Sequence, residues 1–219
     1  MPFELPLFPL NTVLFPGMRL PLQIFEPRYK VMLAELLERG GEFGVLLIRE
    51  GPEVGGEAET FDVGTTACFE EVQEAPDGRF FVTARGRRRF RLLQRLPSAP
   101  YPRGLVDFLP DLPLPDTPAV REAERNVRER FPVYFRAALE LSGQWARDLE
   151  LPARAEELPD FLGPWLQVEE AERQRLLAVV EPEARLSLLA ETIATLAARL
   201  SEEVAEHRRR KYRWLGAEN

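Results

Sequence analysis

Short apolar stretches, many of them alternating with polar residues, dominate the first half of the chain. Segments rich in proline and glycine separate seven such runs, which cover residues 4–8, 19–25, 43–48, 64–72, 79–85, 89–96 and 104–109. This pattern is typical of β-strands with one or two buried faces. Pro76-Asp77-Gly78 lies between two of the runs and has the composition of a hairpin turn, because glycine allows a positive φ. The pattern predicts a compact barrel-like or sandwich-like β domain over residues 1–110.

One helix is predicted to interrupt these strands, at about residues 27–39. Pro27 suits the first turn of a helix, and Gly40 suits a C-terminal cap in the left-handed conformation. Apolar residues between them recur at helical spacing.

The second half of the chain has a helical pattern. Residues 111–118, DLPLPDTP, hold three prolines and are predicted to form a linker. The helical domain is predicted to span residues 119–219, with a kink at Pro132 and a long last helix from Glu183. The predicted fold class is therefore α+β: a β domain with one inserted helix, then a helical bundle that ends in a long helix.

Composition and charge narrow the class of protein. The chain has 45% hydrophobic and 30% charged residues, as water-soluble globular proteins do. A net charge of -7 argues against nucleic acid or anionic lipid as the main partner. Cys68 is the only cysteine, so no internal disulfide can form, and the proline-broken N-terminus does not look like a signal peptide. We expect a cytoplasmic protein without membrane spans.

The residues for most catalytic chemistries are scarce. His207 is the only histidine, so no zinc site of cysteine and histidine ligands can form. Lys30 and Lys211 are the only lysines, and neither belongs to a phosphate-binding loop. We therefore expect no metal, no cofactor and no enzymatic activity. The rival interpretation is an enzyme that uses Glu26 with Arg28, although these residues also suit a clamp at the start of a helix.

A long ordered series of motifs resembles the amino-terminal domain of Lon protease. The matching segments are residues 6–33, 43–47, 62–93 and 101–102, and they include FPGM and IFEPRY. The similarity continues more weakly through residues 172–189, where the matching positions are Gln174, Leu176, Leu177, Arg185 and Leu186.

The resemblance implies a non-catalytic, ATP-independent module that recognises exposed hydrophobic or unfolded polypeptide. Lon proteases continue into an ATPase module and a protease module with a serine–lysine dyad, and we expect both to be missing from this chain. Ser201 and Lys211 could not replace the dyad, because ten helical residues separate them by ~15 Å. A protease or a chaperone would be the natural recipient of the bound segment. The alternative is a structural, assembly or regulatory subunit that docks a folded partner.

Two groups of residues are candidate protein-binding sites. The first group is apolar and lies in or near a proline-bounded loop; its members are Val13, Phe15, Met18 and Phe25. Such side chains either pack into the core or contact a partner, and both interpretations stay open. The second group combines charges with aromatic rings near the C-terminus and would suit docking on an acidic surface; its members are Arg208, Arg209, Arg210, Lys211, Tyr212 and Trp214. The macrodipole of the last helix explains part of this basic charge.

Another arginine cluster, between residues 85 and 95, alternates along a predicted strand. Residues 1–110 are not basic as a whole, so we interpret these arginines as structural and do not expect a nucleic-acid partner.

Overall fold

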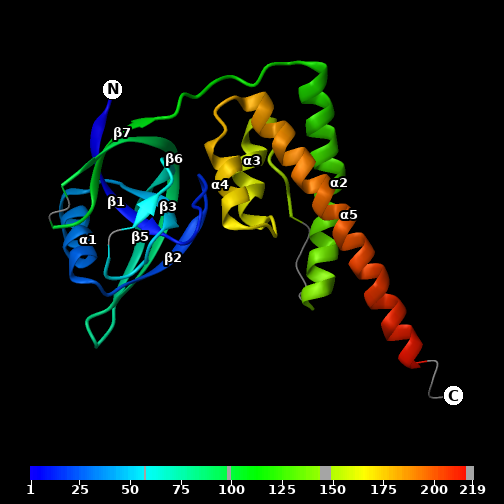
Figure 1. Cartoon of the computed structure of the whole chain (residues 1–219), viewed down its shortest axis with the longest axis horizontal. Helices are drawn as coiled ribbons and strands as arrows, with labels where there is room; N and C mark the ends of the chain where they lie inside the picture. Colours follow the sequence, from blue (N-terminus) through cyan, green and yellow to red (C-terminus); the bar gives the residue numbers. More distant parts are fainter. Residues whose placement is uncertain (57, 98–99, 144–148, 216–219) are drawn as a thin grey trace. The chain divides into compact units, whose positions relative to one another are not determined.

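The computed structural model describes residues 1–56, 58–97, 100–143 and 149–215, with the backbone alone at residues 207, 208 and 210–215. The chain folds into two compact units (Figure 1). The first unit comprises Met1–Asp111 and Val168–Val180, and the second comprises Leu112–Gln167 and Glu181–Asn219.

The first unit is built around a closed sheet. Its strands are β1 (Phe3–Leu10), β2 (Arg19–Ile24), β3 (Phe43–Glu50), β4 (Glu59–Thr60), β5 (Val63–Glu74), β6 (Phe80–Leu96) and β7 (Arg103–Phe108). They are ordered β1-β7-β6-β5-β3-β4, and β2 pairs with β6. A parallel pairing of β1 with β3 closes five of the strands into a ring, and the other pairings are antiparallel. The predicted α+β class and the barrel-like β domain are confirmed.

Strand β6 differs from the sequence prediction. Two runs, at 79–85 and 89–96, form one strand of 17 residues in place of two. The strand continues through the tightly packed Gly86, and the pairing of β5 with β6 shifts its register between Gly86 and Arg89 without ending. The short strand β4 was not predicted.

Helix α1 (Pro27–Arg39) has the predicted bounds, with Pro27 in its first turn and Gly40 at its C-cap. The predicted left-handed cap is wrong in one respect: Gly40 has a positive φ of 71°, but its ψ of 167° is extended. Tyr29, Met32 and Leu33 face inward and join a core cluster with residues of β1, β2, β3, β5 and β6. A second cluster of buried side chains comes from β1, β3, β6 and β7 and includes Phe90. The α1 helix and the ring of strands therefore share a continuous set of buried side chains.

Helix α4 (Glu170–Ala178) belongs to the β-rich unit, whereas the sequence pattern placed it within a helical domain of residues 119–219. The buried Gln174 donates a hydrogen bond of 2.8 Å to the carbonyl of Val63. Arg89 donates to the carbonyls of Leu177 and Val179, at 2.8 and 2.7 Å, at the C-terminal end of the helix. A guanidinium at that end also interacts favourably with the helix dipole.

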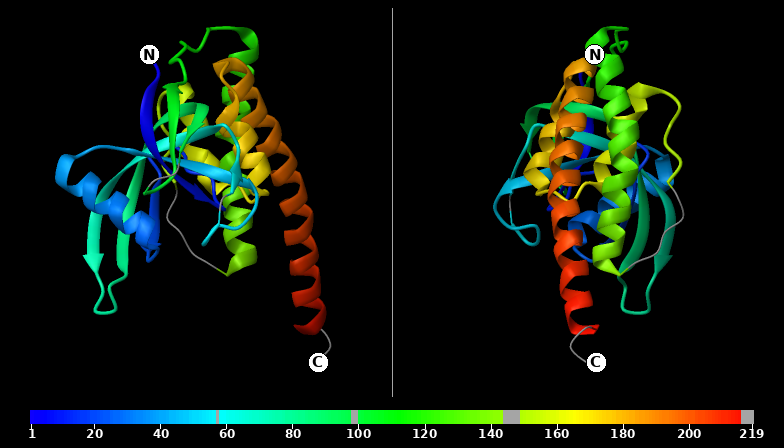
Figure 2. Two further views of the ribbon diagram at one scale, coloured as in Figure 1. Left: turned by 60° about the vertical axis from the view of Figure 1, so that its left-hand side comes forward. Right: turned by 90° about the vertical axis from the view of Figure 1, so that its right-hand side faces the viewer.

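The second unit contains α2 (Pro118–Ser142), α3 (Leu158–Leu162), α5 (Pro182–Leu215) and the 3-10 turns η1 (Ala155–Glu157) and η2 (Gly163–Trp165). The two long helices pack side by side, as both views of Figure 2 show. Thr117 caps α2 by accepting a hydrogen bond from the Val120 amide at 3.1 Å. The helix continues through Pro132, and the last helix is 34 residues long.

Candidate functional site

The apolar loop between β1 and β2 was the first candidate binding site, and the structure corrects this prediction for two of its residues. Val13 and Phe15 are 3% and 0% exposed. Their side chains belong to the core, so they offer no contact area to a partner.

The loop is buried because backbone hydrogen bonds fix it against the sheet. Gly17 donates to the carbonyl of Gly86, and Gly86 donates to the carbonyl of Met18, each at 2.9 Å. The buried hydroxyl of Thr65 donates to the carbonyl of Leu14 at 2.6 Å. A Cβ atom at Gly86 would lie 2.2 Å from the carbonyl oxygen of Phe15, so only glycine permits this close approach.

The other predicted binding residues have different surroundings. Met18 is partly buried against the core, and Phe25 is exposed. Arg209 is exposed on α5. The side chains of Arg208, Arg210, Lys211, Tyr212 and Trp214 lie outside the described part of the structure.

Glu26 and Arg28 form an ion pair of 3.0 Å at the start of α1. Glu26 also accepts a hydrogen bond from the amide of Gly55, and Arg28 donates to the carbonyl of Gly56. Both residues therefore tie the helix start to the loop after β3. Among the described residues no group of three or more histidine, cysteine or carboxylate side chains could hold a metal ion. The helices described there include none that is long and apolar enough to cross a membrane.

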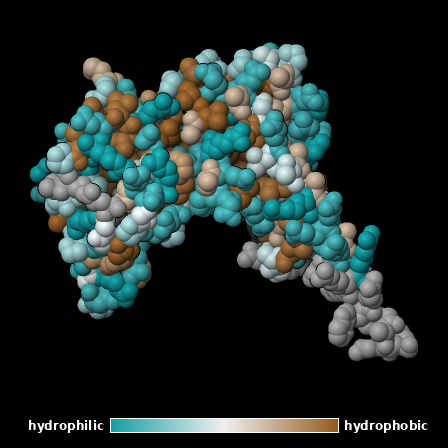
Figure 3. All heavy atoms as spheres, viewed as in Figure 1, coloured by the Kyte–Doolittle hydropathy of each residue, from teal (hydrophilic) through white to brown (hydrophobic). Residues whose placement is uncertain are grey.

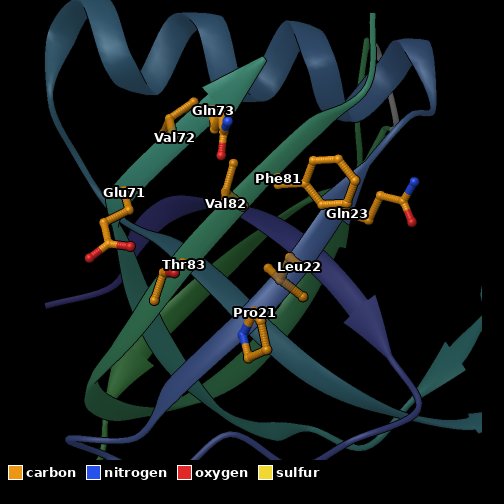
Figure 4. Close-up of a pocket in the computed structure, with 9 residues that line it drawn as sticks. All are labelled: Pro21, Leu22, Gln23, Glu71, Val72, Gln73, Phe81, Val82 and Thr83. Atoms are coloured by element: carbon orange, nitrogen blue, oxygen red, sulfur yellow. The ribbon is translucent and has the colours of Figure 1, made fainter. Parts of the chain in front are cut away.

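A three-stranded ribbon of β2, β6 and the second half of β5 carries exposed apolar side chains on an open surface of the first unit. Cross-strand neighbours on it include Leu22, Val82 and Val72, and next to them Gln23, Phe81 and Gln73. A groove of about 480 Å³ runs over the ribbon. Figure 4 shows Phe81 beside Gln23, with Leu22 and Pro21 further along β2.

Several apolar side chains of this ribbon face solvent. Phe81 is 48% exposed and Val72 is also exposed, although both lie within regular strands. The surface view shows apolar atoms among polar ones close to the hairpin loop that joins β5 and β6 (Figure 3). In that loop Gly78 has a φ of 76°, as the predicted turn requires. Phe81 and Val72 were not among the binding residues predicted from the sequence.

The groove offers contact area with little charge. Phe81 shares its face of the ribbon with Gln23 and Gln73, and the next row on that face is Pro21, Thr83 and Glu71; Leu22 and Val72 also line the groove but are in register with the buried Val82. Glu71 is the one charged residue of the lining among the described residues. Neighbouring charges are paired, since Glu70 contacts Arg19 at 2.9 Å and Arg85 at 3.3 Å. Such a surface can bury apolar side chains and exchange hydrogen bonds with a peptide backbone, without selecting strongly for one sequence.

A family model described as the ATP-dependent protease La (LON) substrate-binding domain matches residues 4–195. The chain belongs to this family.

Curated Lon proteases match nearly the whole of this Lon substrate-binding domain. Lon protease 1 of Thermus thermophilus is 28% identical, over 95% of this chain and 28% of that protein. Lon protease of Anaeromyxobacter dehalogenans is 26% identical, over 88% of this chain and 23% of that protein. The chain thus spans about a quarter of the length of these relatives. Protein cereblon of Danio rerio is 34% identical over 52% of this chain and 27% of its own length.

Solved structures show the same fold. A Lon N-terminal domain protein from Xanthomonas campestris has a TM-score of 0.61 and 27% identity, and the match covers 85% of this chain and 96% of that one. The N-terminal domain of Lon protease from Mycobacterium avium complex has a TM-score of 0.62 and 16% identity, with 88% and 98% covered. The predicted resemblance is confirmed, and the family is that of the substrate-binding part of Lon, not of its catalytic parts.

Proposed function

We propose that this Lon substrate-binding domain captures unfolded polypeptide by holding extended apolar segments on the β2-β6-β5 ribbon. The observation that carries the proposal is Phe81, a half-exposed aromatic side chain that lines an open groove with little charge, in a chain whose family is described as a substrate-binding domain. An extended segment suits this surface because β2, β5 and β6 lie side by side, paired antiparallel, and the groove runs over them. Every second side chain of a bound extended segment can enter the groove.

The apolar contact supplies the binding energy. A phenylalanine can bury ~150–250 Å², and burying the exposed half of Phe81 therefore contributes roughly 2 kcal/mol at ~25 cal/mol per Å². Capture needs no nucleotide, because the chain has no phosphate-binding loop. The bound segment would pass to a protease or chaperone in the cytoplasm, a compartment that fits a chain with one cysteine.

The test compares two exposed apolar residues of the same strand. Phe81→Ala removes the aromatic side chain that lines the groove, and Leu93→Ala removes a side chain that is 50% exposed on β6 but does not line the groove. The probe is a reduced and carboxymethylated model protein, which stays unfolded in buffer, and its affinity is measured by fluorescence anisotropy with and without ATP.

We expect Phe81→Ala to weaken binding about tenfold or more, with Leu93→Ala and ATP changing it less than about twofold. The melting temperatures of both variants should stay near that of the parent, because both side chains are half exposed. Equal losses for the two variants would mean that capture is diffuse and would overturn the assignment of the ribbon. An affinity that requires ATP would overturn the nucleotide-independent mechanism.

A further inference from the structure

A second and larger cavity of the first unit has no role in the function proposed above. Its volume is about 910 Å³, and it shares no lining residue with the ribbon groove. The lining comes from the first turn of α1, the segment around β4, and the connection between β6 and β7. A volume of this size is within the range of ligand-binding pockets.

The cavity walls are stiff and poor in backbone donors. Five prolines line it, namely Pro9, Pro52, Pro97, Pro100 and Pro102, and a proline has no amide hydrogen. Tyr29 also lines the cavity and is only 3% exposed. Burial raises the pKa of Tyr29 to about 12, so its hydroxyl keeps its proton and can donate. Among the described residues this hydroxyl has no hydrogen-bond partner.

Most hydrogen-bond donors of the cavity belong to three arginines. Arg28 contacts Glu26 and the carbonyl of Gly56, and its Nε is buried without a partner among the described residues. The Nε of Arg103 is likewise buried and unpartnered there, and its Nη1 lies 3.6 Å from Glu4.

Arg95 donates one bond of 2.7 Å, to the hydroxyl of Thr60. A guanidinium has five N–H donors, so the three arginines hold many unused donors around one space.

Among the residues that line the cavity, the arginines outnumber the carboxylates by one. Four arginines face three acidic residues, because Arg49 also lines the cavity with Glu53, Glu59 and Asp62. Glu53 accepts bonds from Asn11, and Glu59 pairs with Arg49 at 2.7 Å. Glu26 and Glu4, which neighbour Arg28 and Arg103 at 3.0 and 3.6 Å from outside the lining, remove this excess. An anion would therefore be held by unused guanidinium donors, and a single negative charge suits such a site better than a dianionic phosphate.

We propose that this cavity binds the carboxylate of a polypeptide, as a second contact separate from the apolar ribbon. The guanidiniums of Arg95 and Arg103 would hold the carboxylate by charge-assisted hydrogen bonds, the hydroxyl of Tyr29 would donate a further one, and the proline rings would pack along the adjoining residues. The carboxylate belongs either to the C-terminus of the bound chain or to an acidic side chain, and the experiment separates these two sources.

The test uses the full chain and short unlabelled peptides of alanine and proline, with binding measured by isothermal titration calorimetry. One peptide has a free C-terminal carboxylate, a second is amidated, and a third is amidated with one internal glutamate. Binding of the first alone assigns the site to chain ends, and binding of the first and third assigns it to carboxylates in general. Equal affinity for all three peptides, or no binding, would overturn the proposal.

Variants that change the charge of the lining test whether the peptide binds in this cavity. Arg95→Gln and Arg103→Gln should each weaken the carboxylate-bearing peptide about tenfold and leave the amidated peptide unchanged. Asp62→Asn should strengthen binding, because it removes a repelling charge from the lining. Arg28 is not varied, since its ion pair fixes the start of α1.

Two controls complete the experiment. Phe81→Ala should leave peptide binding unchanged, so that failure of the ribbon proposal and failure of this one give different results. Arg95 is exposed, and Arg95→Gln should therefore fold normally even if Arg103→Gln disturbs β7. Unchanged affinity in Arg95→Gln, or stronger competition by inorganic phosphate than by acetate, would overturn the assignment.

Discussion

Gly86→Ala is the substitution that most directly tests how the β1–β2 loop is held. The added Cβ would lie 2.2 Å from the carbonyl oxygen of Phe15 and 3.1 Å from its carbonyl carbon. These are backbone atoms, so no rotamer change relieves the overlap, and the loop has to move away from β6. The same movement breaks the two backbone bonds of 2.9 Å that join Gly86 to Gly17 and Met18.

The cost follows from the groups that separate. Two backbone hydrogen bonds are worth about 1 kcal/mol each, and partial exposure of the fully buried Phe15 costs about 1.5–3 kcal/mol. We therefore expect Gly86→Ala to lower the free energy of unfolding of the first unit by roughly 3–5 kcal/mol.

The assay must read the two units separately. All three tryptophans, at positions 145, 165 and 214, belong to the second unit, so their fluorescence does not report on the first. Hydrogen–deuterium exchange in increasing urea, read by mass spectrometry on peptides of β1, β5 and β6, gives the stability of the first unit. Arg85→Ala is the matched control, because Arg85 is the exposed neighbour of Gly86 and its ion pair should be worth less than about 1 kcal/mol.

A Gly86→Ala protein within about 0.5 kcal/mol of the parent would refute this reasoning. The loop would then be loosely held, and Val13 and Phe15 would again be candidates for a contact surface.

Two further predictions concern buried polar groups. Asp160→Ala should destabilise the second unit by about 2 kcal/mol, because Arg185 is 4% exposed and loses a carboxylate at 2.5 Å. Urea unfolding followed by tryptophan fluorescence measures this loss of stability. Asp116→Ala is the control, and it should be nearly neutral because Asp116 is exposed. Tyr29 has a folded-state pKa of about 12, raised by burial above the usual 10.0, so the stability it contributes is present below pH 10 and is lost as the pH rises toward 12. Across that window the parent should lose about 2 kcal/mol more than Tyr29→Phe in urea titrations, and identical pH profiles would contradict the burial of this hydroxyl.

Local signals in the sequence predicted the elements of the first unit well. Pro27 and Gly40 marked both ends of α1, because each residue has a conformational preference that suits its place at a helix end. Alternation located the strands, and the Pro76-Asp77-Gly78 turn formed with the expected positive φ at its glycine. These features depend on residues that are close together in the chain.

Long-range contacts could not be predicted in this way. The hydrogen bond from Gln174 to Val63 joins residues 111 positions apart, and nothing in the helical pattern of residues 170–178 indicates which unit the helix packs against. The apolar loop was ambiguous for the same reason. Hydrophobicity shows that Phe15 has to be covered, but only the close approach of Gly86 shows that its own chain covers it.

The exposed face of β6 is an intermediate case, because the alternation of side chains along a strand predicts which residues face solvent but not which of them bind a partner. Side chains alternate between the two faces, so Phe81 shares a face with the exposed Arg85, and Leu93 shares one with the exposed Arg91. Alternation alone therefore predicts that both Phe81 and Leu93 face solvent. What distinguishes them is the pairing of β2 and β5 with β6 around Phe81, which forms the groove that Phe81 lines and Leu93 does not. If exposure alone made a binding surface, the two alanine variants would lose the same affinity for an unfolded protein; a loss confined to Phe81→Ala would show that recognition depends on the groove that strand pairing creates.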